Sequence, residues 1–265
     1  MPASRKSVPR VTGVVHLAAL PGSPHWGGDL DAVVSAACRD TESWLEGGVD
    51  ALLLENFGDT PFSPGRVDAE VVAAMARIAC AVTPLAADIP LGFNVLRNDA
   101  RSALGLVASC RGSFLRVNVL TGAAATDQGI IEGQAYSLLR ERQRLGLTET
   151  AQIWADIHVK HATPLGNEDV CDAARDTLTR GGADVLIISG TGTGVPVDLT
   201  VLARVRDAVP EAPLLIGSGA DADSVAGLLR HADGIIVGTA AKAGGVVSAP
   251  VDLERVRRLV GAAYA

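Results

Sequence analysis

The sequence has few of the features that mark specialised classes of protein. Aromatic residues make up only 3% of the chain, and none of its four cysteines belongs to a CxxC pair. Scattered cysteines of this kind predict reduced, buried thiols rather than disulfides or a zinc site. No apolar run approaches the roughly 18 residues that a membrane-spanning helix needs, and the short basic N-terminus lacks the apolar core of a signal peptide. We therefore expect a cytoplasmic protein without membrane insertion.

An excess of basic charge is also absent. The formal net charge is -7, which gives no reason to expect nucleic acid or an anionic membrane as a partner. The GxGxxG fingerprint of dinucleotide-binding proteins and the Gly-Lys-Ser/Thr of P-loop proteins are both missing, so the run 190–194 predicts only a flexible loop beside a binding site. An acidic protein can still bind a phosphorylated small molecule through local backbone dipoles.

The chain does contain a regular alternation of apolar strands and amphipathic helices. Its 265 residues are 48% hydrophobic, which is enough for a large core. Strands are expected at residues 11–17, 51–55, 91–95, 114–119, 152–161, 184–189, 213–217 and 234–237. Helices are expected at 29–46, 68–82, 99–110, 168–179, 198–208, 221–229 and 252–263, with another in the second half of 120–146 after a mobile loop. This pattern predicts a single (β/α)8 TIM barrel over residues 11–265, preceded by an N-terminal extension, residues 1–10. A doubly wound open sheet is the competing fold, but it usually has fewer units.

Polar side chains occur at the carboxyl ends of the expected strands. In the strand 152–161, Asp156, His158 and Lys160 occupy alternate positions, so all three should project from one face. Taken singly, each polar residue also fits an ordinary role, such as a hydrogen-bonded core histidine or a turn-forming asparagine. Together they favour a polar pocket at the barrel mouth, because burying them without partners would cost about 1–3 kcal/mol each. The other residues at strand ends are His16, Glu55, Asn94, Arg116, Asn118 and Ser189.

Glycine-containing turns follow the last strands. The seventh strand leads into Gly217, Ser218 and Gly219, and the eighth into Gly238 and Thr239. Glycine lets the backbone approach a ligand, and the standard phosphate site of a TIM barrel lies after strands seven and eight. We therefore predict that these turns bind phosphate, together with Gly190 after the sixth strand.

Several segments at these strand ends resemble the BtpA family. They are Val15-His16-Leu17-Ala18-Ala19-Leu20-Pro21-Gly22, Leu54-Glu55-Asn56-Phe57-Gly58-Asp59-Thr60-Pro61-Phe62, Gly92-Phe93-Asn94-Val95-Leu96-Arg97-Asn98-Asp99, Phe114-Leu115-Arg116-Val117-Asn118, Ala155-Asp156-Ile157-His158-Val159-Lys160-His161 and Ile188-Ser189-Gly190. The resemblance covers nearly the whole chain. It implies a TIM barrel of the ribulose-phosphate-binding kind. It further implies either a role in photosystem I biogenesis, from which the family takes its name, or an enzyme of sugar or nucleoside phosphates.

The residues at the mouth predict an enzyme that acts on a phosphorylated sugar or nucleotide-like molecule by acid/base chemistry. Asp156 and His158 are the leading acid/base candidates, since a carboxylate can shift a histidine pKa toward the working pH. Lys160 suits either an oxyanion partner or a Schiff-base nucleophile, and Arg116 suits a second anionic group. Isomerisation, C–C lyase chemistry and glycosidic cleavage are all open. The last of these would use Glu55 opposite Asp156 as a carboxylate pair.

Three alternatives remain open at the level of sequence. A non-catalytic assembly or stability factor would retain the barrel pocket without using it for turnover. A divalent metal on Asp156, His158, Glu55 and His16 is a further option, although no HExxH-type spacing supports it, and no other cofactor is expected. A homo-oligomer is also open, because closed symmetric oligomers are common among soluble proteins.

Overall fold

Eight parallel strands form a closed barrel in the computed structural model, which describes residues 8–86, 88–166, 169–190 and 197–265. The barrel strands are β1 (Val11–His16), β2 (Ala51–Glu55), β3 (Leu91–Asn94), β4 (Phe114–Val117), β7 (Gln152–Ile157), β9 (Val185–Ile188), β10 (Leu214–Ile216) and β11 (Gly234–Val237). Each pairs in parallel with the barrel strand before and after it along the chain, and β11 closes the ring on β1. The predicted TIM barrel is confirmed.

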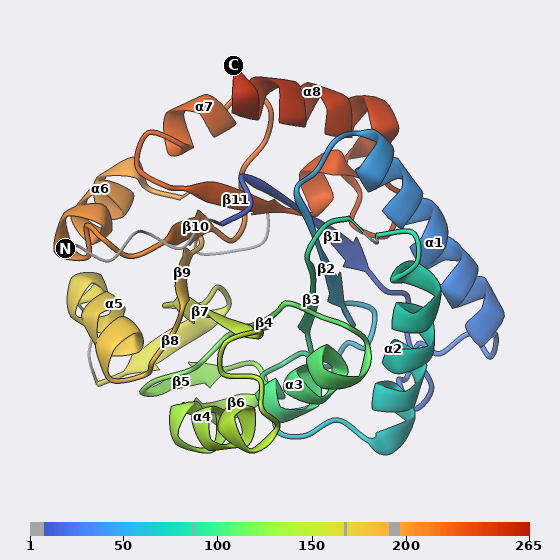
Figure 1. The fold of residues 1–265 in the computed structure, drawn as a ribbon, viewed down its shortest axis with the longest axis horizontal. Helices are drawn as coiled ribbons and strands as arrows, with labels where there is room; N and C mark the ends of the chain where they lie inside the picture. The colour runs from blue at the N-terminus through green and yellow to red at the C-terminus, as the bar shows by residue number, and fades with distance from the viewer. Residues whose placement is uncertain (1–7, 87, 167–168, 191–196) are drawn as a thin grey trace.

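Helices connect the strands and surround the barrel (Figure 1). They are α1 (Leu30–Glu46), α2 (Ala69–Val82), α3 (Ala100–Ser109), α4 (Ala135–Arg144), α5 (Val170–Thr179), α6 (Leu199–Ala208), α7 (Val225–Leu228) and α8 (Leu253–Tyr264), with 3-10 turns η1 (Thr239–Ala241) and η2 (Ala243–Gly245) after β11. Aspartate side chains accept a backbone N–H at the start of five of them: Asp29, Asp99, Asp169, Asp198 and Asp252. Such caps satisfy donors that the helix cannot, which explains why the helices begin there. No helix in the described ranges is long and apolar enough to cross a membrane.

Alternate residues of each strand face two separate cores. The larger core lies between the strands and the helices, and the smaller one fills the barrel interior. Phe114 and Trp154 stack in this interior with ring centroids 3.7 Å apart. Two residues further along the same strands come Arg116 and Asp156, so the alternation carries the interior face from aromatic packing to charged groups at the mouth. Phe114 and Arg116 therefore project from the same face of β4.

A three-stranded antiparallel sheet was not expected from the sequence. It consists of β5 (Ala123–Thr126), β6 (Gly129–Glu132) and β8 (Ala162–Leu165), in the order β6-β5-β8. Two of these strands form a hairpin in the segment between β4 and α4, where the sequence indicated a mobile loop, and β8 lies in the loop after β7. We call it the lid sheet. It joins two connections on the carboxyl side of the barrel, and Val119, Ala124, Ile131 and Val159 form a small core beneath it.

Strand β7 is shorter than predicted. It ends at Ile157, because His158 has a left-handed backbone conformation with a φ of 50° and His161 has one with a φ of 56°. Residues with positive φ cannot continue a strand, so the alternation of faces stops at Ile157. The expectation that Asp156, His158 and Lys160 share one strand face was therefore wrong.

Candidate active site

Three polar side chains form a row across neighbouring strands. His16, Glu55 and Asn94 are register partners at the ends of β1, β2 and β3. Asn94 donates a hydrogen bond from Nδ2 to Glu55 Oε2 at 2.6 Å, and His16 Nε2 lies 3.7 Å from Glu55 Oε1. Glu55 and Asn94 are buried. The row fixes the Glu55 carboxylate from one side, and it lies where the sequence predicted a pocket.

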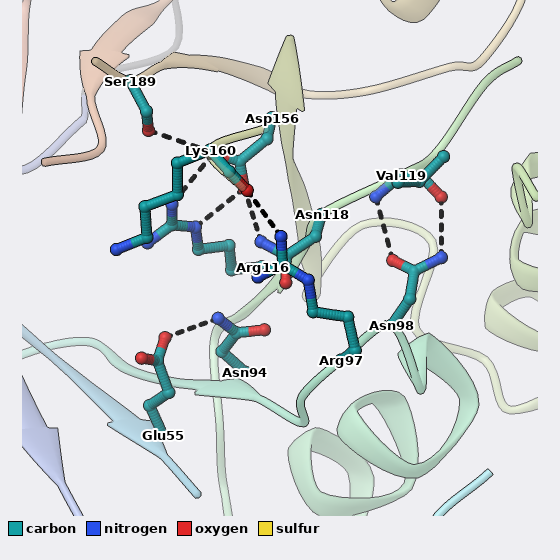
Figure 2. Close-up of polar contacts among 10 residues, drawn as sticks. All are labelled: Glu55, Asn94, Arg97, Asn98, Arg116, Asn118, Val119, Asp156, Lys160 and Ser189. Carbon is teal, nitrogen blue, oxygen red and sulfur yellow. Dashed lines mark hydrogen bonds and ion pairs between the residues drawn. The ribbon is translucent and has the colours of Figure 1, made fainter. Parts of the chain in front are cut away.

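A second network occupies the opposite strands. Arg116 donates two hydrogen bonds to the Asp156 carboxylate, each at 2.9 Å, and Asn118 donates a third at 2.8 Å. Ser189 donates a longer one of 3.4 Å, so four predicted site residues converge (Figure 2). A bidentate interaction with a guanidinium group fixes the orientation of a carboxylate. Asp156 is thus engaged with its neighbours, and the arrangement suits positioning rather than acid/base exchange.

Lys160 lies where two cavities meet. One cavity, of about 190 Å³, lies toward β10 and β11, and the other, of about 390 Å³, lies toward β3 and the lid sheet. Four side chains line both cavities: Glu55, Phe57, Arg116 and Lys160. Among the residues that the structure describes, Lys160 forms no ion pair with a carboxylate. Its amine is therefore available to a ligand in either cavity.

Burial changes the protonation of two groups at the mouth. It lowers the pKa of His16 to about 4, so this imidazole is neutral at pH 7. Burial also lowers the pKa of Lys160, and the positive charge of Arg116 lowers it further. A lysine amine in such surroundings exchanges protons at a lower pH than a solvated one, which is a property of catalytic lysines.

His158 lies apart from these groups. It lines a separate cavity of about 110 Å³ beneath the lid sheet, with Thr177 and Asp176 of α5. The structure therefore does not place His158 with Lys160 and Glu55 at the junction of the two mouth cavities. Within the described ranges, no group of three or more His, Cys, Asp or Glu side chains is arranged to hold a metal ion. The suggested metal ligands Asp156, His158, Glu55 and His16 are thus not brought together.

The predicted glycine turns line the smaller mouth cavity. Gly217, Ser218, Gly219, Gly238 and Thr239 all contribute to its wall. The buried Ser218 hydroxyl has no hydrogen-bond partner in the described part of the chain. Gly190 is buried after β9 and is absent from this wall, and residues 191–194 of the predicted flexible loop lie outside the described ranges.

Two of these glycines are needed for packing as well as for access. A Cβ atom on Gly217 would lie 2.5 Å from the Ser189 hydroxyl, and one on Gly238 would lie 2.3 Å from Cε1 of His16. The side chain of His16 thus fits only because residue 238 has no side chain. At Gly219 the reason for glycine is the backbone and not packing, because its φ of 78° is a left-handed conformation that favours glycine.

One charged residue of the site was missed by sequence reasoning. Arg97, in the loop after β3, is only 4% exposed and lines the larger mouth cavity. It donates a 2.6 Å hydrogen bond from Nη2 to the backbone oxygen of Lys160 (Figure 2). The sequence signal that could have indicated Arg97 was its place in the segment 92–99, three residues beyond Asn94. Phe57, which lines both cavities and packs on His16 with ring centroids 4.6 Å apart, was also overlooked.

The fold and the pocket together define a TIM barrel with polar and charged groups gathered at the carboxyl ends of its strands. Phosphoribosyl anthranilate isomerase from Thermococcus kodakaraensis has a similar structure, with a TM-score of 0.56 and 14% sequence identity over 96% of this chain and 98% of that one. KGPDC from Streptococcus mutans is similar at a TM-score of 0.58 and 10% identity, over 97% and 98% of the two chains. Likeness at these identities concerns the fold.

Sequence similarity identifies the family. The model of the BtpA family matches residues 7–265, and the chain belongs to this family. The photosystem I biogenesis protein BtpA of Synechocystis sp. is 47% identical over 253 residues, which cover 95% of this chain and 87% of that protein. An uncharacterised protein of Thermococcus kodakarensis is 46% identical over 248 residues, or 94% and 92% of the two chains. The resemblance noted in the sequence motifs is confirmed.

Proposed function

We propose that the protein is an enzyme that moves a proton next to a carbonyl group of a phosphorylated small molecule, as an isomerase or a lyase. The observation that carries this proposal is the position of Glu55 and Lys160 at the junction of two cavities, one of which is lined by the glycine turns. The phosphate would bind those turns. The reacting carbons would then lie over Glu55 and Lys160.

The backbone and side chain of the turn suit an anion. Gly219 and Ala220 donate no backbone hydrogen bond to another residue in the described ranges, and the Ser218 hydroxyl is buried without a partner. Phosphate oxygens would accept from such groups. Asp221 also lines this cavity, but its Oδ1 accepts hydrogen bonds from the backbone and hydroxyl of Ser224. These hydrogen bonds orient the Asp221 carboxylate toward Ser224, in its own loop.

The proposed step is the transfer of a proton between a carbon atom of the substrate and the Glu55 carboxylate. Glu55 takes a proton from the carbon beside the carbonyl, and the electron pair moves onto the carbonyl oxygen. The Lys160 ammonium group stabilises the resulting oxyanion. Return of the proton to the former carbonyl carbon, with transfer of the proton of the neighbouring hydroxyl to the oxyanion, completes an isomerisation. In a lyase reaction Glu55 instead takes the proton of the hydroxyl group β to the carbonyl, the C–C bond between them breaks, and its electron pair moves onto the carbonyl oxygen. Asn94 holds Glu55 in place through the 2.6 Å hydrogen bond.

Glycosidic cleavage by Glu55 and Asp156 is less well supported. Such cleavage needs one carboxylic acid that gives up its proton and one free carboxylate. Asp156 accepts two hydrogen bonds from Arg116 and one from Asn118, so its oxygens are already occupied by groups of the protein. We assign Asp156 the role of holding Arg116 and Asn118 in the wall of the pocket.

Exchange of substrate hydrogens in deuterium oxide tests the proposal. A set of ketose and aldose phosphates is incubated with the protein and followed by proton NMR for loss of the signal beside the carbonyl. Glu55→Gln and Lys160→Met should each slow this exchange by roughly 100-fold or more. Glu46→Gln is the matched control, because Glu46 makes an exposed ion pair with Arg257 on the outer surface. Equal exchange by Glu55→Gln and the control would contradict the proposal.

An assembly role is the second candidate, favoured by the 47% identity to the Synechocystis protein named for photosystem I biogenesis. The two candidate functions differ in whether the cell requires catalytic turnover in the pocket. In a strain lacking the native gene, the Glu55→Gln variant should fail to restore function if turnover is required. Full restoration by this variant, at wild-type protein abundance, would favour the assembly role.

A further inference from the structure

Arg97 carries a buried positive charge without an acidic partner. The residue is 4% exposed, and no described carboxylate forms an ion pair with it. Its Nε atom is buried without a hydrogen-bond partner, while Nη2 is used by the backbone oxygen of Lys160. Leaving a buried guanidinium uncompensated is costly, because a lone charge loses its hydration without gaining an ion pair. Most buried polar groups in native structures have a hydrogen-bond partner, so the free Nε atom calls for a specific explanation.

The contrast with Arg116 shows what a structural arginine looks like in the same pocket. Arg116 is equally buried, but two of its nitrogen atoms bond the Asp156 carboxylate at 2.9 Å. Arg97 comes from the loop after β3 rather than from a strand, and its guanidinium group extends into the same region of the site (Figure 2). It lines the larger mouth cavity rather than the cavity with the glycine turns. A ligand anion would supply the partner that the protein does not.

We infer that Arg97 binds a carboxylate at the far end of the substrate, so that the substrate is a phosphorylated carboxylic acid. This inference rests on the proposed function, since it extends the same ligand from the glycine turns across Glu55 and Lys160 into the larger cavity. A guanidinium group matches the two oxygens of a carboxylate. A carboxylate fits better than a second phosphate, because Glu55 and Asp127 line the same cavity and would repel a dianion more strongly. The cavity of about 390 Å³ has the size of a small-molecule site.

Two matched pairs of compounds test the inference without knowledge of the true substrate. 6-Phosphogluconate and sorbitol 6-phosphate have the same chain length and differ in whether the far end is a carboxylate. 3-Phosphoglycerate and glycerol 3-phosphate make the same comparison over a shorter distance. Titration calorimetry of the wild-type protein should show binding of the acid roughly tenfold or more tighter in at least one pair, as expected for a charge-assisted hydrogen bond.

The variant Arg97→Met should remove this preference. Its affinity for the phosphorylated acid should fall to that of the matching alcohol phosphate, while its affinity for the alcohol phosphate stays at the wild-type value. The second result separates anion binding from a structural role, because a collapse of the loop around Lys160 would weaken both compounds. A uniform loss for both compounds, or an unchanged preference in the variant, would overturn the inference.

The wild-type titrations distinguish the two levels of proposal. Binding of the alcohol phosphates with no preference for either acid would overturn the inference and leave the proposed function in place. Failure of the wild-type protein to bind inorganic phosphate or any of the four compounds would overturn the proposed function, and the inference with it.

Discussion

Charged residues at the barrel mouth differ in whether the protein itself neutralises them. Arg116 and Asp156 neutralise each other through two hydrogen bonds, whereas Lys160 and Arg97 have no ion-pair partner in the described ranges. A paired group keeps its geometry when a ligand arrives, and an unpaired one gains an interaction. The paired residues therefore shape the pocket, and the unpaired ones are those expected to touch the substrate.

The largely buried His16 should make stability depend on pH. Its pKa is about 4 in the folded protein and about 6.5 when exposed, so the unfolded chain binds the extra proton between these values. The free energy of unfolding should therefore decrease as the pH falls from 6.5 to 4, by about 3 kcal/mol from this residue. Urea unfolding at several pH values measures the effect. The His16→Asn variant should show a smaller loss, and an identical slope in both proteins would contradict the assignment.

Gly238 and His16 should be energetically coupled. A methyl group at residue 238 would collide with the imidazole ring, so Gly238→Ala should lower the free energy of unfolding by about 1–3 kcal/mol. Replacing His16 by Ala removes the atoms that collide. In a double-mutant cycle, Gly238→Ala should therefore cost less in the His16→Ala background than in the wild type. Additive costs in denaturant unfolding would show that the two sites do not interact.

The residues of the site were predictable where the strand alternation holds. Arg116, Asn118 and Asp156 follow interior positions of regular strands, and the structure brings them together. His158 could not be placed correctly, because its left-handed backbone conformation interrupts the period-two pattern. Arg97 lies beyond the end of its strand, where the period-two alternation no longer indicates which side chain turns back into the barrel.

At the scale of elements, a buried ion pair joins helix α1 to the segment after β11. Lys242 Nζ lies 2.5 Å from Asp40 Oδ2, and Asp40 Oδ1 accepts a hydrogen bond from the backbone N–H of Val251. Lys242 is only 2% exposed. The interaction fixes the chain between residues 242 and 251 against the helix.

Removal of one partner of this pair should be more harmful than removal of both. Asp40→Ala leaves a buried ammonium group unpaired and should lower the free energy of unfolding by about 3–5 kcal/mol. The double variant Asp40→Ala, Lys242→Met should recover part of that loss, because no uncompensated charge remains. Thermal and urea unfolding of the three proteins measure the difference. A double variant less stable than Asp40→Ala would argue against charge burial as the cause.

Elements with strong periodicity were predicted more accurately than the irregular segments. Strands β2 and β11 have the expected bounds, and α1 begins directly after its capping residue Asp29. The lid sheet was missed because three of the four residues of β5 are alanines, which are depleted in strands. Its pairing with β8 joins segments on either side of β7, a long-range contact that local sequence patterns do not encode.

At the scale of the whole molecule, the number and spacing of strand–helix units were sufficient to predict the barrel. Barrel closure then determines which strand ends meet, and this is why residues from β1, β4 and β11 line one pocket. The chemistry is less constrained by the fold, since the same barrel supports many reactions. The substrate therefore has to be inferred from the site.

Phosphate binding should be visible in the stability of the entire chain. A ligand present at 100 times its dissociation constant stabilises the folded state by about 2.7 kcal/mol. For a domain of this size, the melting temperature should rise by roughly 5–10 °C in saturating inorganic phosphate. Differential scanning fluorimetry measures this shift against sodium chloride of equal ionic strength. The same shift with chloride would show a general salt effect and not a site.

The lid sheet also has a consequence for how this family can diverge. Strand β5 belongs to the segment between β4 and α4 and β8 to the loop after β7, so each strand constrains the length of the other's connection. An insertion or deletion in one segment alone would break the register between Ala123 and Leu165. Relatives that change the length of one segment should therefore carry a compensating change in the other, so that the two loops evolve as one unit.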